Sequence, residues 1–386
     1  MSQKKKLVIV ESPAKCKKIE SILGKEYICK ASMGHIRLLK SVDIDKDFSP
    51  NFILDPKKNA NTKDLINISK KCSETIIASD LDREGEAIGF HLIEVLGLNP
   101  KTTKRIVFNE ITKKSITQAI ESPKLIDYNM YNAQKTRLML DQIVGFQLSP
   151  ILWKYIKRGL SAGRVQSPGL RILCEREHKI DEFIPERFYK ITGQFKLDKN
   201  IIQASLDQNI TDKKPTLSFL HLCQEAIFKI INIKSSDSSR SPPQPFITST
   251  LQQEASKVHG IPPKSCMHIA QKLYEAGLIT YMRTDSVILS DKALNDIEKY
   301  IKDEYTDEYY HRRVFKNKSD NSQEAHEAIR PVEVTNINIR TILDDPSCQK
   351  LYTLIWKRTV ASQMKPMKIN INKIEISLPN TKDYQF

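Results

Sequence analysis

Three acidic residues alternate along the segment ASDLDREGE, where Asp80, Asp82 and Glu84 are each separated by one residue. In an extended turn, alternate side chains point to the same side, so the three carboxylates can gather around one cation. Hard oxygen ligands of this kind favour Mg²⁺. The same residues also suit a solvated loop that leads into a helix, because acids complement the dipole at a helix N-terminus. Taken alone, the spacing leaves both interpretations open.

A fourth carboxylate stands at an equivalent place in another element. Glu11 directly follows the apolar run KLVIV (6–10), and Asp80 follows the run ETIIAS (74–79). Both runs have the β-branched composition of buried parallel strands, and the carboxyl ends of parallel strands meet at one edge of a sheet. We therefore expect Glu11 to lie near the alternating acids.

The segment GLITYMRTDS offers a nucleophile beside a cation. Tyr281 stands two residues before Arg283, a spacing that puts both side chains on one side of a strand-like segment. A tyrosine oxygen can attack phosphorus, and a guanidinium can neutralise the charge that develops on phosphate oxygens. The alternative is that Tyr281 is simply packed in the core, as most such tyrosines are.

Two βα units must position these residues. The run 6–10 predicts a strand followed by a loop and a helix to Leu23, and the run 74–79 predicts a strand followed by a helix over 83–96 that stops at Gly97. Residues 105–108 are expected to form a third strand. The predicted fold class is therefore α/β at the N-terminus, with a small parallel sheet and helices on its faces.

The remainder of the chain predicts a mixed, multidomain protein. Residues 127–181 have a helical pattern that is interrupted by the stretch RGLSAGRVQSPG, and residues 248–301 have another. Short strand-like runs are YKITGQF, NIIQASL, LITYMRT, MKININ and KIEISL. The Ser- and Pro-rich stretch SSDSSRSPPQPF (235–246) indicates a domain boundary.

Composition narrows the class of partner. Lys and Arg number 61 against 46 Asp and Glu, a net charge of +15 in 386 residues, which favours nucleic acid but also suits a surface that only confers solubility.

The seven cysteines are scattered without a C-x-x-C pair, so we expect reduced thiols and no zinc site. Cys223 lies two residues from His221, but no second pair accompanies them. No apolar run approaches the roughly 20 residues that cross a bilayer, and the apolar run near the N-terminus is too short for a signal peptide. We therefore expect a cytosolic protein without membrane partners.

Together, LVIVESPAK and ASDLDREGEAIGFHL resemble the Toprim domain of topoisomerases and primases. The resemblance implies that Glu11 acts in proton transfer at the scissile phosphate and joins Asp80, Asp82 and Glu84 around Mg²⁺. Bacterial primases and type II topoisomerases share this domain, so it does not by itself select one family.

The segment GLITYMRTDS (277–286) closely resembles the active-site signature of bacterial type IA DNA topoisomerases. The resemblance implies that Tyr281 is the nucleophile that forms a 5′-phosphotyrosyl link, that Arg283 clamps the phosphate, and that Asp285 is a positioning residue on the DNA side.

Other segments match the same family in order along the chain. SPAK supplies Lys15 for the scissile phosphate, and the expected DNA contacts are His35 and Arg37 in SMGHIR, Arg137 in QKTRLML, Arg164 and Gln166 in LSAGRVQS, and His326 in QEAHEAIRP. Read without the family, His326 suits a helix cap and LSAGRVQS a flexible connector. Leu138, Gln142 and Phe146 depart from the family pattern, as does the lack of an acid and a proline after GHIR, so fewer phosphate contacts are implied.

The resemblance implies a four-part domain organisation. The expected parts are a Toprim domain (1–38 and 60–126), a helical DNA-binding domain (127–184), a β arch (185–240 and 366–386) and a catalytic tyrosine domain (241–365). The implied function is transient single-strand cleavage, strand passage and religation that relax negatively supercoiled DNA. The protein is expected to act as a monomer at the cytoplasmic nucleoid. No G-x-x-x-x-G-K-[ST] motif for ATP occurs, so the phosphotyrosine bond must store the energy of the broken strand.

Two rival interpretations remain. One is a Toprim primase or nuclease, against which GLITYMRTDS argues. The other is a truncated or decayed copy that binds or cleaves DNA without productive strand passage. Relatives continue for about two hundred residues beyond the tyrosine domain, and MKININ and KIEISL look like the return into the arch, so we expect a chain that ends inside a domain.

Overall fold

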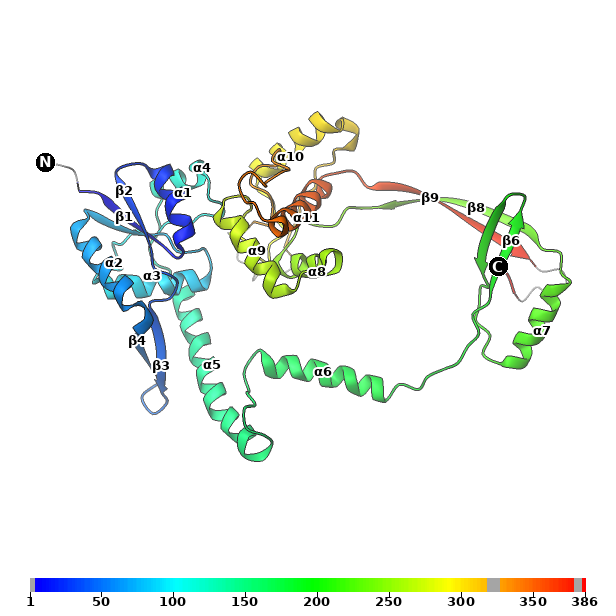
Figure 1. Cartoon of the computed structure of the whole chain (residues 1–386), viewed down its shortest axis with the longest axis horizontal. Coiled ribbons are helices and arrows are strands. Elements are labelled where there is room, and N and C mark those ends of the chain that lie inside the picture. The colour runs from blue at the N-terminus through cyan, green and yellow to red at the C-terminus, as the bar shows by residue number, and fades with distance from the viewer. Residues whose placement is uncertain (1–3, 318–326, 378–383) are drawn as a thin grey trace. The chain divides into compact units, whose positions relative to one another are not determined.

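The computed structural model describes residues 4–317, 327–377 and 384–386. The chain divides into two compact units (Figure 1). The first unit comprises residues 1–167 and 242–365, and the second comprises residues 168–241 and 366–386. The expected division into four domains stays a proposal.

A parallel sheet forms the N-terminal part of the first unit. Its strand order is β2 (Tyr27–Ala31), β1 (Lys6–Val10) and β5 (Glu74–Ile77), and both pairings are parallel. The central strand β1 is apolar on both faces because helices cover both. Leu7 and Ile9 join the core formed with α3, whereas Val8 and Val10 join a second core that continues among the residues around Tyr281. One continuous core therefore connects the sheet to the tyrosine-bearing part of the first unit.

The other elements of the first unit are nine helices among the described residues, two short 3₁₀ turns and a hairpin. They are α1 (Pro13–Leu23), α2 (Asn59–Lys71), α3 (Arg83–Leu96), α4 (Lys113–Glu121), α5 (Tyr128–Tyr155), α8 (Thr248–His259), α9 (Pro263–Glu275), α10 (Asp291–Glu304), α11 (Pro346–Ser362), η1 (Pro56–Lys58), η2 (Asp307–Tyr309), β3 (Arg37–Asp43) and β4 (Ser49–Leu54).

The second unit contains two antiparallel ribbons and a helix around a small core. The ribbons are β6 (Thr192–Leu197) with β7 (Asn200–Ser205), and β8 (Lys229–Arg240) with β9 (Met367–Ser377); the helix is α7 (Lys213–Gln224). The core includes Leu206, Phe219, Ile376 and Phe386. Helix α6 (Gln166–Asp181) begins at the end of the first unit and continues in the second.

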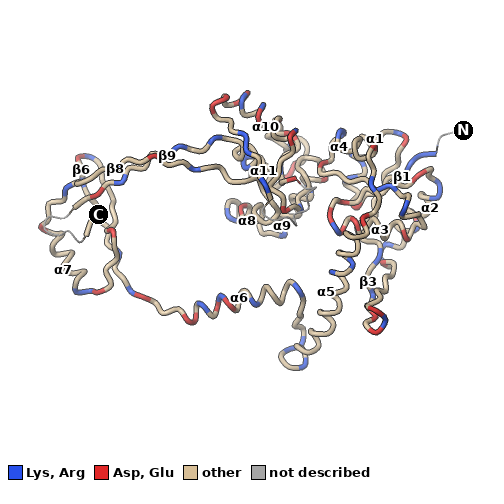
Figure 2. Tube along the Cα trace, turned by 180° about the vertical axis from the view of Figure 1, so that it is seen from behind, with Lys and Arg blue, Asp and Glu red and all other residues tan. Residues whose placement is uncertain are grey.

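Basic residues occur throughout the fold. Figure 2 shows Lys and Arg on most elements of both units, and acidic residues near the turn of the β3–β4 hairpin. The acidic residues of this part of the hairpin are Asp43, Asp45 and Asp47. Within the described ranges, none of the helices combines the length and apolarity that crossing a membrane requires.

Two strand predictions were wrong. Residues 105–108 contribute only single-residue bridges of Arg105 to Ile77 and to Lys124, and the third strand of the sheet is β2 instead. LITYMRT forms only the bridge between Ile279 and Pro331. Its backbone bonds involve three different segments, at Asn109, Thr248 and residues 330–332, so no continuous ladder develops.

The boundary stretch is partly structured. In the stretch expected to contain a domain boundary, SSDSSR forms the end of β8 and pairs with β9 from Ser235 to Arg240, and the two units divide between Ser241 and Pro242. Both faces of this ribbon are largely exposed, so polar residues fit there without an apolar pattern.

Candidate active site

The two βα loops meet at the carboxyl edge of the sheet. The β1 and β5 strands run in register, and the backbone N–H of Ala78 donates to the carbonyl of Ile9 at 2.7 Å. Beyond the strands, the N–H of Asp80 donates to Glu11 Oε1 at 2.7 Å. Glu11 and the acidic segment are therefore adjacent, as their places after parallel strands predict.

Lys15 is a buried cation at this edge. Ser12 caps helix α1, which places Lys15 in the first turn of the helix. The Lys15 side chain is 1% exposed, forms a short ion pair with Asp80 and lies 5.0 Å from the centre of the Tyr274 ring. Burial and the neighbouring Asp80 carboxylate raise the pKa of Glu11 to about 7.

Tyr281 meets the acidic segment directly. Its hydroxyl donates to Asp82 Oδ2 at 2.7 Å, and Arg283 Nη1 lies 3.4 Å from the same oxygen. The Tyr281 side chain is 3% exposed and packs edge-on against Tyr274, with ring centres 5.2 Å apart. Burial and repulsion by Asp80 and Asp82 raise the pKa of Tyr281 above its usual value, so the hydroxyl is protonated and acts as a donor here.

Glu84 is held on the other side of the loop. Its Oε2 lies 2.9 Å from His35 Nε2 and accepts from Gln134 Nε2 at 3.2 Å. These bonds, that of His35 first, lower the pKa of Glu84. The carboxylates of Asp80, Asp82 and Glu84 therefore each bond to a different set of side chains.

A cavity of about 620 Å³ opens beside the site. It is lined by Asp82, Glu84, Arg137, Arg283 and Asp285, together with polar residues of α8. Arg137 and Asp285 are exposed. Two of the expected DNA contacts thus line the same cavity as Asp82, which accepts the hydrogen bond of the Tyr281 hydroxyl.

Of the remaining expected DNA contacts, those that the structure describes do not line this cavity. Arg37 pairs with Glu94 and also donates to the carbonyl of Phe52 at 3.4 Å. Arg164 Nε lies 2.6 Å from Asp141 Oδ1, and Gln166 lines a separate cavity of about 560 Å³ at the end of α5. His326 falls outside the described residues.

Arg105 is a site residue that the sequence pattern did not single out. Its guanidinium is 1% exposed, donates to the carbonyl of Asp80 at 2.9 Å and pairs with Glu86 at 2.8 Å. Its Nε and Nη1 have no partner among the described residues. A lone arginine in the apolar stretch RIVF was the available signal, and the strand prediction concealed it.

The donor chemistry of the acidic segment fits a hard divalent cation, because four carboxylates lie on two adjacent loops. Among the residues that the structure describes, however, no three His, Cys, Asp or Glu side chains converge as a metal centre. Lys15, Arg283 and His35 face these carboxylates instead. Binding a cation therefore requires at least some of these partners to be exchanged.

Gly85 allows the acidic loop to close, and Gly85→Ala tests this. A Cβ atom at Gly85 would lie 2.1 Å from the carbonyl oxygen of Asp80, which is backbone and cannot turn away. We expect Gly85→Ala to lower the free energy of unfolding by about 1–3 kcal/mol, as overpacking does. Thermal or denaturant unfolding measures the effect.

Gly145→Ala is the matched control, since Gly145 lies inside α5 and a Cβ there meets only Ala162 O at 3.8 Å. This change should instead raise stability by about 0.5–1 kcal/mol. Equal effects of the two substitutions would contradict the close approach at Asp80.

Comparison with known proteins adds family relationships. Residues 6–111 match the family described as Toprim domain, and residues 125–386 match the family described as DNA topoisomerase. The chain is 43% identical to "DNA topoisomerase 1 type prokaryotic" of Acanthamoeba polyphaga mimivirus, over 96% of this chain and 46% of that protein. The solved structure of full-length topoisomerase I from Thermotoga maritima matches with a TM-score of 0.85 and 39% identity, over 98% of this chain and 64% of that one. The chain thus spans about half the length of the viral relative.

Proposed function

Because the chain belongs to the type IA DNA topoisomerases, we propose that it cleaves one DNA strand through Tyr281 and reseals it without ATP. The expected fold class, a Toprim domain joined to helical and β parts, is confirmed by the two family matches and the structural match. One observation carries the proposal: the Tyr281 hydroxyl bonds to Asp82 at 2.7 Å while Arg283 faces the same carboxylate. The hydroxyl of the proposed nucleophile and the guanidinium proposed to bind phosphate thus both contact one oxygen atom of the acidic segment.

The proposed cleavage is a displacement at phosphorus. The Tyr281 oxygen forms a bond to the phosphorus while the bond from phosphorus to the 3′ oxygen breaks, which leaves the 5′ end on the tyrosine. The tyrosine proton moves towards Asp82, and the 3′ oxygen takes up a proton, for which Glu11 is placed beside the segment. Religation is the same displacement in reverse.

Toprim is a divalent-metal-binding domain in topoisomerases. We infer that Asp80, Asp82, Glu84 and Glu11 would hold Mg²⁺, which supplies positive charge against phosphate oxygens when it is bound. Lys15 and Arg283 provide fixed positive charge on the chain itself.

The proposed substrate is negatively supercoiled DNA with single-stranded character, acted on by a monomer. The cavity lined by Asp82 is also lined by Arg137 and Arg283, whose guanidinium groups would contact phosphates of such a strand, and by Asp285. Phosphate contacts of this kind position a strand without reading its sequence.

An oligonucleotide assay tests the proposal. The protein is incubated with a single-stranded oligonucleotide labelled at its 3′ end, denatured and analysed for label attached to protein. A label that enters the protein band is the expected result, because the 5′ end of the downstream fragment stays on tyrosine. Absence of any adduct, with a matched plasmid that stays supercoiled, would count against the function.

Arg283→Ala should slow adduct formation by on the order of 100-fold or more, because it removes a donor aimed at developing negative charge. Arg283 is 57% exposed in its side chain, so its removal should leave folding largely intact. Rates of adduct formation under single-turnover conditions measure the effect. Arg312→Ala, which removes an exposed arginine paired with Asp291 at 3.1 Å, serves as the control. Equal rates for the two variants would remove Arg283 from the site.

A further inference from the structure

Within the described part of the chain, Tyr281 lies outside the sheets. The Tyr281 N–H donates to the carbonyl of Asn109 at 2.8 Å, and the N–H of Thr280 donates to the carbonyl of Arg330 at 3.0 Å. The N–H of Arg330 donates in turn to Thr280 Oγ1 at 3.0 Å, and this hydroxyl donates to the carbonyl of Ala328 at 2.7 Å. The backbone at the tyrosine is therefore fixed by two segments that are distant in sequence, around residues 109 and 328–330.

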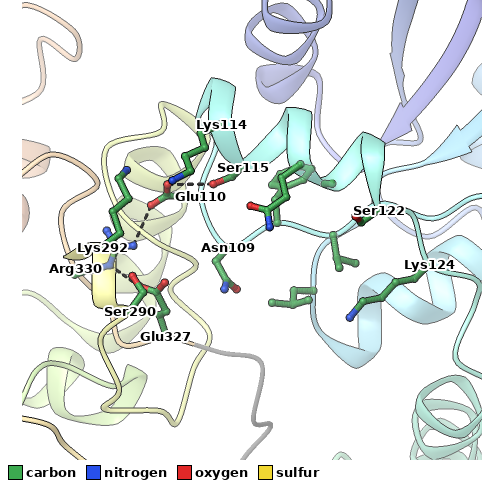
Figure 3. A pocket seen from close by; sticks show the side chains of 15 residues that line it. Asn109, Glu110, Lys114, Ser115, Ser122, Lys124, Ser290, Lys292, Glu327 and Arg330 are labelled. Atoms are coloured by element: carbon green, nitrogen blue, oxygen red, sulfur yellow. Dashed lines mark hydrogen bonds and ion pairs between the residues drawn. The ribbon is translucent and has the colours of Figure 1, made fainter. Parts of the chain in front are cut away.

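A buried ion pair joins these two segments. Arg330 is 5% exposed and Glu110 is 6% exposed, and Arg330 Nη2 lies 3.1 Å from Glu110 Oε2 (Figure 3). Arg330 Nε also lies 2.5 Å from Glu327 Oε2, and Nη1 donates to the carbonyl of Pro331 at 3.1 Å. Attraction between buried charges is stronger than in water because less solvent screens it. The two carbonyls that accept from the tyrosine segment therefore belong to the pair or adjoin it. Asn109 directly precedes Glu110, and Arg330 is itself a member of the pair.

Glu110 is itself held in place. Its Oε1 accepts from the hydroxyls of Thr112 at 3.2 Å and Ser115 at 3.1 Å, at the N-terminus of α4. Figure 3 shows Glu110 directed from the start of α4 towards Arg330, with Ser115 on its other side. The carboxylate has partners on both oxygens, and those on Oε1 hold it independently of Arg330. It therefore fixes the position of the guanidinium.

We propose that Arg330 is a positioning residue for Tyr281, which acts through its buried pair with Glu110 to hold residues 280–281 against Asn109. The inference rests on the proposed function, because it takes Tyr281 as the nucleophile. Arg330 does not line the cavity that contains Asp82 and Arg283, so its effect on the reaction is indirect. Displacement of a reacting group by about 1 Å can cost on the order of 100-fold in rate.

The space around the pair permits a chemical test. Arg330, Glu110 and Glu327 line a cavity of about 420 Å³, with Lys114 and Lys292 among the other lining residues. Truncation of Arg330 extends this cavity towards two glutamates that lack their cation. Methylguanidinium has the charge and donor geometry of the missing group and is small enough for the space.

The experiment uses Arg330→Ala in the full chain. We expect the single-turnover rate of adduct formation to fall by on the order of 100-fold. Affinity for the oligonucleotide should change little, since phosphate contacts by other residues dominate it. Methylguanidinium should restore much of the rate, whereas sodium chloride at the same ionic strength should not. Arg313→Ala is the control, because Arg313 bonds to carbonyls of Ser362 and Met364 and not to the tyrosine segment.

Folding is checked separately by thermal unfolding of each variant. If Arg330→Ala does not fold, Glu110→Gln decides, because it removes the charge at almost constant volume and should lower the rate without changing oligonucleotide affinity. A folded variant that forms adduct at the wild-type rate overturns the positioning role. So does a loss that methylguanidinium leaves unchanged and that Arg313→Ala reproduces. Wild-type protein that forms no adduct at all would instead refute the proposed function, so the two failures are distinguishable.

Discussion

Tyr281→Phe is expected to abolish the covalent protein–DNA adduct while leaving DNA binding nearly intact. The substitution removes the one oxygen that can form the phosphate ester, and phenylalanine has no substitute nucleophile. The ring and its packing against Tyr274 are retained, so the buried site should keep its shape. Binding depends mainly on contacts between cationic side chains and phosphates, to which a single buried hydroxyl contributes little. The assay is adduct formation on a 3′-labelled oligonucleotide beside a binding titration with the same oligonucleotide.

Tyr274→Phe provides a matched control for this result. Tyr274 is fully buried next to Tyr281, and its hydroxyl donates to the carbonyl of Phe108 at 3.5 Å. Among the described residues its hydroxyl makes no bond to the acidic segment, so its removal should leave adduct formation in place. An adduct retained by Tyr281→Phe, or lost only in Tyr274→Phe, would show that the nucleophile has been misassigned.

Replacing Asp80 and Asp82 together by Ala should eliminate Mg²⁺-dependent religation and relaxation, while Tyr281 still cleaves, more slowly, because the Asp82 carboxylate that accepts its proton is gone. Mg²⁺ is held by one or two protein carboxylates plus waters, and a lone carboxylate on a solvated loop binds it weakly. The change also leaves Lys15 buried without its partner, which should destabilise the protein by about 3–5 kcal/mol. Calorimetric titration with Mg²⁺, followed by religation of a preformed adduct, gives the two readouts. The paired Asn variants retain side-chain volume and separate loss of ligand from loss of packing.

Replacing Asp43 and Asp45 of the exposed β3–β4 hairpin by Ala is the corresponding control. It changes the net charge by the same amount but leaves the acidic segment intact. This variant should bind Mg²⁺ as the wild type does. Unchanged Mg²⁺ affinity in the Asp80 and Asp82 double variant would refute the assignment of the metal site.

Elements with strong local signals were predicted from the sequence. The runs KLVIV (6–10) and ETII (74–77) are rich in β-branched residues and apolar towards their carboxyl ends, so they predict buried strands without reference to the rest of the chain. The proximity of Glu11 and Asp80 followed from that prediction, because parallel strands bring their carboxyl ends to one edge. The meeting of Tyr281 with Asp82 followed only from the family resemblance, since about two hundred residues separate them.

The misses have physical causes. Strand β2 carries Cys29 and Lys30 within YICKA, so its sequence lacks a clear apolar run, yet it pairs with β1 and is partly buried. SSDSSR pairs with β9 in an exposed ribbon, where the backbone ladder supplies the order and side chains need not be apolar. Glu110 and Arg330 gave no signal, because a buried ion pair between residues 220 positions apart exists only once the chain has folded.

The register between β1 and β5 restricts how this protein can evolve. The strands pair from Lys6 opposite Glu74 to Ile9 opposite Ile77, and both carry their carboxylates within a few residues of the last pair. One residue inserted into either strand would shift its carboxylate by about 3.3 Å and turn the following side chains to the opposite face. A residue added in the β3–β4 turn, by contrast, moves none of these groups. Length variation among descendants of this sequence should therefore accumulate in such turns, while the two short strands keep a fixed length even if most of their side chains are exchanged.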